Sequence, residues 1–266
     1  MKAHLASVWK SVVAVATFVA GASLASAQAS LPLVEHFNYP TGNLVGNTIA
    51  GGTWQRTGTN TSSTVQVLSG SLAYSGLPAS QGNKVQLLNG SGYEDPGIDV
   101  ASTTQTVYAS FILNVVNPGT VTTGDYIFNF SSAGTGSSDY RTRVYVQLGT
   151  TSGNFKLGLR HGSSDTIQQS NDLPVGTPVF VVVAYNFAPG DDSSSMWINP
   201  VLGQTSPPSA DLTATASQDL AAVGRVNLRQ GGSSTSQVIE LDELRVSTSW
   251  TDVTPTNAGV DDWTLY

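Results

Sequence analysis

The sequence predicts an all-β protein, folded as a two-sheet antiparallel jelly-roll sandwich. From Leu31 onward, apolar and polar residues alternate in short runs, and clusters of Gly, Pro, Asn and Ser close each run. No long stretch has the period of an amphipathic helix. Charged residues make up only 11% of the chain, which suits a β-protein with many turns and a neutral, hydroxyl-rich surface.

The N-terminus has the pattern of a bacterial-type secretion signal. Lys2 and Lys10 flank a polar start, an apolar run follows over 11–20, and Ala25-Ser26-Ala27 supplies the small residues that signal peptidase requires. The apolar run is too short to span a bilayer comfortably. We therefore expect a signal peptide over 1–27, a jelly-roll domain over 28–255 and a tail over 256–266, with the mature protein secreted or at the cell surface and not inserted in the membrane.

Composition excludes several kinds of site. The chain has no cysteine, so the fold cannot depend on disulfides and no thiolate can bind a metal or act as a nucleophile. A net charge of −7 disfavours nucleic acid and acidic membrane surfaces as partners.

The alternating pattern places the strands and their buried faces. Candidate strands cover 31–37, 64–74, 83–88, 104–116, 125–130, 141–148, 154–161, 179–187, 195–199, 222–229 and 238–246. The run 179–187 is apolar on both faces and is expected in mid-sheet. Over 141–148, one face carries Arg141, Arg143, Tyr145 and Gln147, so this polar face could contact a ligand. In the following strand, His161 shares the apolar face, away from Lys156 and Arg160.

A family resemblance enters with the last strand. The segment Ile239-Glu-Leu-Asp-Glu-Leu-Arg-Val246, followed by Ser247-Thr-Ser-Trp250, resembles the closing strand of laminin-G-like, concanavalin A-type jelly rolls of bacterial secreted and surface proteins. Three other segments fit the same family: Glu35-His-Phe-Asn-Tyr39 with Gly42, Trp197-Ile-Asn-Pro200, and Asn227-Leu-Arg-Gln-Gly231. The resemblance covers most of 31–255 and implies the fold. It leaves the function open, because this superfamily includes lectins, glycanases, lyases and structural domains.

The resemblance implies two uses for the acids of the last strand. Laminarinase-type hydrolases of the superfamily carry three acids on such a strand; here Glu240 and Asp242 share a face, Glu243 is expected on the opposite face, and the third acid is missing. Many of these jelly rolls also join their first and last strands through calcium. Glu35 and Asp242 would then be the carboxylate ligands of a structural calcium ion.

Two further interpretations concern polysaccharides. A lyase needs Arg to neutralise a uronate and Tyr or His to move a proton, but His161 is expected on the face opposite Arg143. A sugar platform needs exposed aromatic rings, for which the candidates are Trp54, Tyr93, Tyr145 and Trp197.

The hypothesis that these observations favour is a secreted, non-catalytic domain that binds a carbohydrate or another extracellular matrix component. Its expected ligand-binding residues are Arg141, Arg143, Tyr145, Gln147 and Trp197. Two alternatives stay open: a polysaccharide lyase or glycoside hydrolase on the same fold, and a structural or self-assembling surface protein that docks through the tail Asp261–Tyr266.

Overall fold

The computed structural model describes residues 27–120, 122–232 and 236–257. The expected signal sequence over 1–26 and the tail segment 258–266 lie outside these residues. Across the described ranges, no helix is both long and apolar enough to cross a bilayer.

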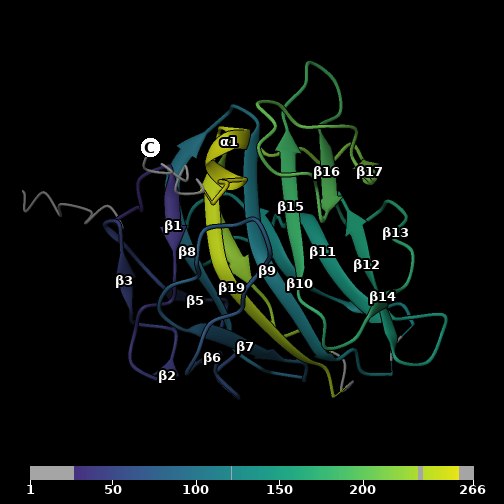
Figure 1. Cartoon of the computed structure of the whole chain (residues 1–266). Coiled ribbons are helices and arrows are strands. Elements are labelled where there is room, and N and C mark those ends of the chain that lie inside the picture. The colour runs from purple at the N-terminus through teal and green to yellow at the C-terminus, as the bar shows by residue number, and fades with distance from the viewer. Residues whose placement is uncertain (1–26, 121, 233–235, 258–266) are drawn as a thin grey trace, which may run out of the picture.

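The first of two antiparallel sheets contains the strand that closes the domain (Figure 1). Its order is β17-β16-β15-β9-β19-β7-β6-β2, and β1 also pairs with β19. The bounds are β17 Leu212–Thr215, β16 Ser193–Ile198, β15 Val179–Asn186, β9 Val107–Asn117, β19 Val238–Ser247, β7 Lys84–Leu88, β6 Gln66–Leu68, β2 Gly42–Asn43 and β1 Leu33–Glu35.

The second sheet packs behind the first and has the order β13-β12-β11-β10-β18-β8-β5, with β14 pairing with β12. The bounds are β13 Gln168–Gln169, β12 Asn154–Arg160, β11 Arg141–Leu148, β10 Asp125–Ser131, β18 Val223–Leu228, β8 Asp95–Thr103, β5 Gln55–Thr57 and β14 Leu173–Pro174. A separate ribbon joins β3 (Thr48–Ile49) to β4 (Gly52–Thr53). The predicted all-β, two-sheet jelly-roll sandwich is confirmed.

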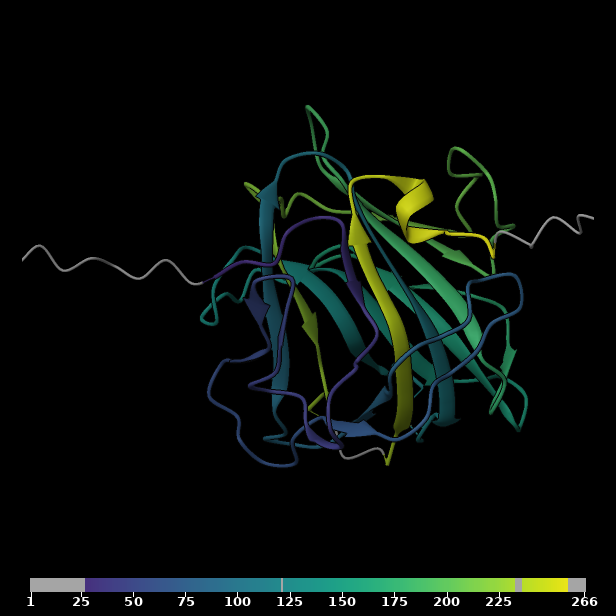
Figure 2. The same cartoon turned by 60° about the vertical axis from the view of Figure 1, so that its left-hand side comes forward.

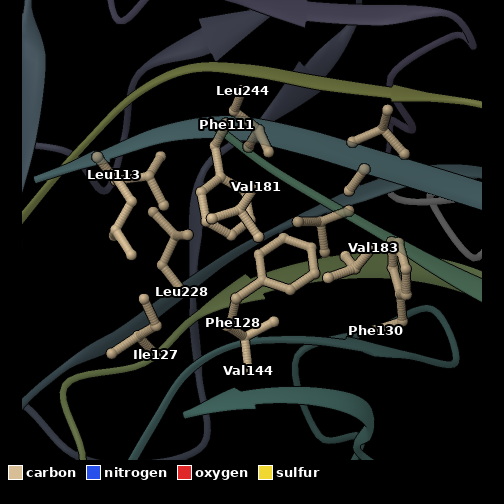
Figure 3. Close-up of a cluster of buried hydrophobic side chains, with 14 of the residues drawn as sticks. Phe111, Leu113, Ile127, Phe128, Phe130, Val144, Val181, Val183, Leu228 and Leu244 are labelled. Atoms are coloured by element: carbon tan, nitrogen blue, oxygen red, sulfur yellow. The ribbon is translucent and has the colours of Figure 1, made fainter. Parts of the chain in front are cut away.

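Large apolar side chains fill the space between the sheets (Figure 3). Phe111 and Val181 of the first sheet face Phe128 and Val144 of the second, and the ring centroids of Phe111 and Phe128 are 5.3 Å apart. Burial of this area, at roughly 25 cal/mol per Å², is the main stabilising contribution in a chain without disulfides.

A smaller apolar layer covers the outer face of the first sheet, the face turned away from the second sheet. Phe180, Val182 and Ile112 pack there against Trp197 and against Trp250 of the short helix α1 (Trp250–Val253). The loop 69–82 between β6 and β7 crosses over β19 on this side (Figure 2). The strand β15 is therefore buried on both faces, as predicted for the apolar run 179–187.

One long strand, β8, was not predicted. It begins with Asp95-Pro-Gly-Ile98, and Pro and Gly ordinarily indicate a turn. The reason for Gly97 is a close approach: a Cβ atom there would lie 2.4 Å from Oδ1 of Asn227 and 2.7 Å from Nε of Arg225. The strand pattern is thus interrupted where a large side chain lies across the backbone.

Arg225 is the centre of a polar network on the outer face of the second sheet, the face turned away from the first sheet. Its side chain is fully buried, and its Nη1 donates to Oδ1 of Asp99 at 2.7 Å. The loop 132–140 covers the network, because Gly134 N donates to Asp99 and Gly58 N donates to the carbonyl of Thr135. This part of the outer face is closed to solvent.

We expect Arg225→Met to lower the free energy of unfolding by about 3–5 kcal/mol, because it leaves the buried Asp99 carboxylate without its cation. Lys156→Met is the control: Lys156 lies 4.0 Å from Asp172 in a more exposed ion pair, and its loss should cost less than about 1 kcal/mol. Guanidinium chloride denaturation measures both. Equal effects in the two variants would contradict the importance of the Arg225–Asp99 pair.

Candidate functional site

The strand β11 presents the predicted polar residues on the outer face of the second sheet. Arg143 pairs with Arg160 across β12, Tyr145 pairs with Gly158, and Tyr126 of β10 lies opposite Tyr145. The side chains therefore form rows that cross several strands, because directly opposed residues project from the same face.

Tyr126 lies between two guanidinium groups. The Cζ atom of Arg229 is 4.1 Å from the centroid of the Tyr126 ring, and Cζ of Arg143 is 5.1 Å from it. Arg229 also pairs with Asp125 at 2.5 Å and lies 3.8 Å from Asp95. Burial raises the pKa of Asp95 to about 6, against the lowering effects of the hydrogen bond from Gln230 N and of the Arg229 charge.

Arg141 and Arg143 converge on one backbone oxygen. Nη1 of Arg141 donates to the carbonyl of Tyr140 at 2.9 Å, and Nε of Arg143 donates to the same oxygen at 3.2 Å. Arg141 also donates to the carbonyl of Gln218. Within the described ranges, neither guanidinium has a carboxylate within ion-pair distance.

The charges of this pair are held close together at a half-buried position. Burial lowers the pKa of Arg141, and the positive charge of Arg143 lowers it further, whereas Asp139 acts in the opposite direction. An anion placed between the guanidiniums would relieve their repulsion and accept hydrogen bonds from the remaining N–H groups. Of the expected ligand-binding residues, these two are brought together.

Tyr145 and Gln147 are on the expected face but are covered. Tyr145 is 6% exposed, and Gln147 is 1% exposed. Nε2 of Gln147 donates to the carbonyls of Thr122 and Thr123, so this amide fixes the preceding loop. Neither side chain is available to a ligand in this arrangement, which corrects the expectation from the sequence.

Trp197 is far from this face. It belongs to the apolar layer on the outer face of the first sheet, where its ring centroid is 5.0 Å from that of Trp250. Its Nε1 donates to the carbonyl of Pro208. Trp54 is buried as well, and of the proposed sugar platform only Tyr93 is half-exposed. Most of the large aromatic side chains serve packing because apolar strand faces needed cover on both sides.

His161 lies between the sheets, as the alternation predicted. Its Nδ1 is 2.9 Å from Oγ of Ser194, and the ring packs against Tyr185 with the centroids 5.4 Å apart. Burial lowers its pKa, which favours the neutral ring. The histidine and Arg143 occupy opposite faces of the second sheet, so they cannot act together on one substrate.

The expected calcium ligands do not meet. Glu35 pairs in register with the core residue Leu244, whereas Asp242 pairs with Ile112 of the outer apolar layer. The two carboxylates thus lie on opposite faces of the first sheet.

Both carboxylates already accept hydrogen bonds from protein donors. Glu35 accepts from Phe37 N, from the Tyr39 hydroxyl and from Trp54 Nε1. Asp242 accepts from the backbone N–H groups of Leu72 and Glu243. Donors that point at a carboxylate compete with a cation, so these two residues do not fit a shared calcium ion. No cluster of three or more His, Asp or Glu side chains suited to a metal occurs in the described part of the chain.

Glu243 departs from the simple alternation. It forms a β-bulge with φ of 52°, and its carboxylate accepts from Gln81 N in the same loop that covers Asp242. The expectation that it lies on the opposite face from Asp242 is therefore wrong. Glu240 binds Lys84 at 2.8 Å and accepts from Asn114. All three acids are at most 9% exposed, so this strand presents no open pair of carboxylates.

The pH dependence of stability should reveal Asp242. Burial raises its pKa from 3.8 to about 7, partly opposed by the two backbone hydrogen bonds. A carboxyl whose pKa is raised on folding stabilises the native state while it is protonated, and this contribution is lost as the pH rises through the folded pKa. Between about pH 5 and pH 8, the free energy of unfolding should fall by about 1–3 kcal/mol more in the natural protein than in Asp242→Asn.

Urea denaturation at several pH values measures this difference. Asp95, whose raised pKa acts in the same direction, is present in both proteins, so the comparison isolates Asp242. Parallel curves for the two proteins would show that Asp242 is ionised in the native state throughout this range.

No family model and no curated protein matches the chain. Three solved structures show a distant likeness. The alginate lyase Aly36B, in complex with an alginate trisaccharide, is 15% identical with a TM-score of 0.44, over 62% of this chain and 80% of that one. Domain 4 of the extracellular arabinanase AbnA from Geobacillus stearothermophilus, in complex with arabinotriose, is 17% identical with a TM-score of 0.44, over 84% and 93%.

The third structure is the receptor binding domain of a botulinum neurotoxin C/D mosaic serotype, 11% identical with a TM-score of 0.42, over 75% of this chain and 43% of that one. Likenesses at this level add nothing to the fold assignment, which rests on the sheets and core of the chain itself.

Proposed function

We propose that the chain is an exported, non-catalytic binding domain for an extracellular glycan that carries acidic groups. The observation that supports the proposal best is the pair Arg141 and Arg143, whose guanidiniums meet at the Tyr140 carbonyl without a carboxylate partner in the described chain. Planar guanidiniums bind carboxylate and sulfate groups through paired hydrogen bonds. A uronate or a sulfated sugar supplies such a group.

The neighbourhood of the pair suits recognition more than cleavage. Arg143 is also held over the Tyr126 ring, and the half-buried ring of Tyr140 lies 6.4 Å from that of Tyr126, so the guanidinium is oriented before a ligand arrives. Burial raises the pKa of Tyr140, which disfavours the phenolate that could act as a base. His161 is on the other face, and the acids of β19 are covered. These positions support binding without bond cleavage.

Charge-removing variants test the proposal. Polygalacturonate and chondroitin sulfate are the acidic probes, laminarin is the neutral one, and isothermal titration at near-physiological salt is the measurement. We expect the double variant Arg141→Gln/Arg143→Gln to bind the acidic probes at least about 10-fold more weakly than the natural protein, since each charge-assisted hydrogen bond contributes about 1.5–3 kcal/mol.

The matched control is Lys156→Gln, which removes a charge from the same face, from the residue that pairs with Gln147. Its binding should stay within about twofold of the natural protein because only general screening changes. An equal loss in the Lys156 and Arg143 single variants would indicate diffuse attraction, and no binding to either acidic probe would contradict the proposal. Release of unsaturated or reducing ends would replace it with the enzyme alternative.

Export is the remaining part of the proposal, and it rests on the N-terminal pattern. When the full chain is expressed in a bacterium with a Sec system, the exported protein should begin at Gln28, because signal peptidase accepts Ala25 and Ala27 as the small residues before the cut. N-terminal sequencing of periplasmic or medium fractions is the measurement. Retention of Met1 in the mature protein would exclude cleavage.

A further inference from the structure

A second concave site lies at the end of the sandwich where β7 ends and β19 begins (Figure 1). Its volume is about 430 Å³, within the range of roughly 300–1,000 Å³ that is common for small-molecule pockets. Ser91 and Ser236 at its mouth are exposed, whereas Asn89 and Gln237 are buried. The lining residues are Leu88, Asn89, Gly90, Ser91, Tyr93, Ser236, Gln237 and Val238.

The hydrogen bonds of Gln237 fix how Asn89 is oriented. Nε2 of Gln237 donates to the carbonyls of Pro118 and Val146, so its Oε1 must be the acceptor of the next bond. Asn89 meets that oxygen with its Nδ2 at 3.1 Å. Because the amide nitrogen of Asn89 is used there, its Oδ1 is turned the other way, and a flipped amide would break the chain of bonds.

Oδ1 of Asn89 is therefore an acceptor without a donor. The residue is 8% exposed, and this oxygen is buried with no hydrogen-bond partner in the described chain. A buried polar atom left unpaired costs about 1–3 kcal/mol, so such an atom on a pocket wall points to a ligand or water molecule that supplies an N–H or O–H group.

An aromatic ring stands beside this acceptor. The ring of Tyr93 lies directly against Gly90, where an added Cβ atom would be only 2.4 Å from Cζ of the tyrosine. The turn is closed by Tyr93 N, which donates to the carbonyl of Gly90. The half-exposed ring is thus held in place and can offer a flat apolar surface to a ligand.

The lining contains no charged side chain, which limits the class of ligand. A metal ion would need carboxylates, and an anion would be repelled by the free carbonyl oxygen of Asn89. We propose that this pocket binds one neutral sugar unit, with a sugar hydroxyl donating to Asn89 Oδ1 and a C–H face packed on Tyr93. The proposal goes beyond the arginine pair, since it uses different residues and a different kind of ligand group.

The pocket also adjoins the outer face of the second sheet. Gly232 N donates to Oδ2 of Asp125, whose Oδ1 accepts from Arg229 beside Tyr126. A Cβ atom on Gly231 would be 2.5 Å from Nδ2 of Asn89 and 2.8 Å from Oδ2 of Asp125. The absence of a side chain at Gly231 is what allows the asparagine and the aspartate to approach each other.

Saturation-transfer NMR on the full mature chain tests the pocket. The probes are neutral trisaccharides of glucose, xylose, arabinose and mannose. We expect transfer to at least one of them in the natural protein and its loss in Ser91→Trp, which fills the mouth from an exposed position without disturbing the buried amides. Asn89→Ala should weaken the same trisaccharide about 5–10-fold, as expected for one lost hydrogen bond.

The arginine variant separates this proposal from the previous one. Arg141→Gln/Arg143→Gln should keep the full signal from the neutral trisaccharide, whatever its effect on acidic polysaccharides. An unchanged melting midpoint shows that Ser91→Trp is folded. The proposal is overturned if no neutral trisaccharide shows transfer, in which case water satisfies Asn89, or if Ser91→Trp keeps the signal of the natural protein.

Discussion

Aspartate side chains that accept hydrogen bonds from backbone N–H groups hold the segments that lie over both sheets of this cysteine-free domain. Asp242 fixes the loop 69–82 through Leu72, and Asp99 fixes the loop 132–140 through Gly134. Asp165 and Asp172 do the same for the turns after β12 and β11. The few acids of this sparsely charged chain are thus largely committed to loop structure, and the site chemistry falls to guanidiniums and amides.

The sheets could be predicted because burial on a pleated surface imposes a period of two on the sequence. The strand β11 has its predicted bounds, and β7, β9, β10, β15 and β19 agree within a few residues. β8 could not be found, since Gly97 answers to the bulk of Arg225, a residue distant in sequence. The predicted strand over 64–74 continued too far: beyond Leu68 the alternating residues belong to a loop that packs on β19.

Residue type and alternation placed Arg143, Tyr145 and Gln147 on one face, but they could not show which of these side chains neighbouring loops cover. Trp197 was assigned to the ligand because exposed and packed tryptophans look alike in sequence. The bulge at Glu243 shifts the register within the closing strand, where strict alternation fails. The pocket at Asn89 had no sequence signal, since amides are common throughout this composition and only their mutual bonding sets one oxygen apart.

The outermost strands of both sheets are very short. The first sheet ends in β2 and β17, of 2 and 4 residues, and the second ends in β13 and β5, of 2 and 3 residues. A protein outside the cell has no ATP-driven chaperone to separate molecules that pair edge to edge. With so little unpaired backbone at each margin, a neighbouring molecule finds almost no template for strand addition, so this domain can be crowded on a surface without polymerising.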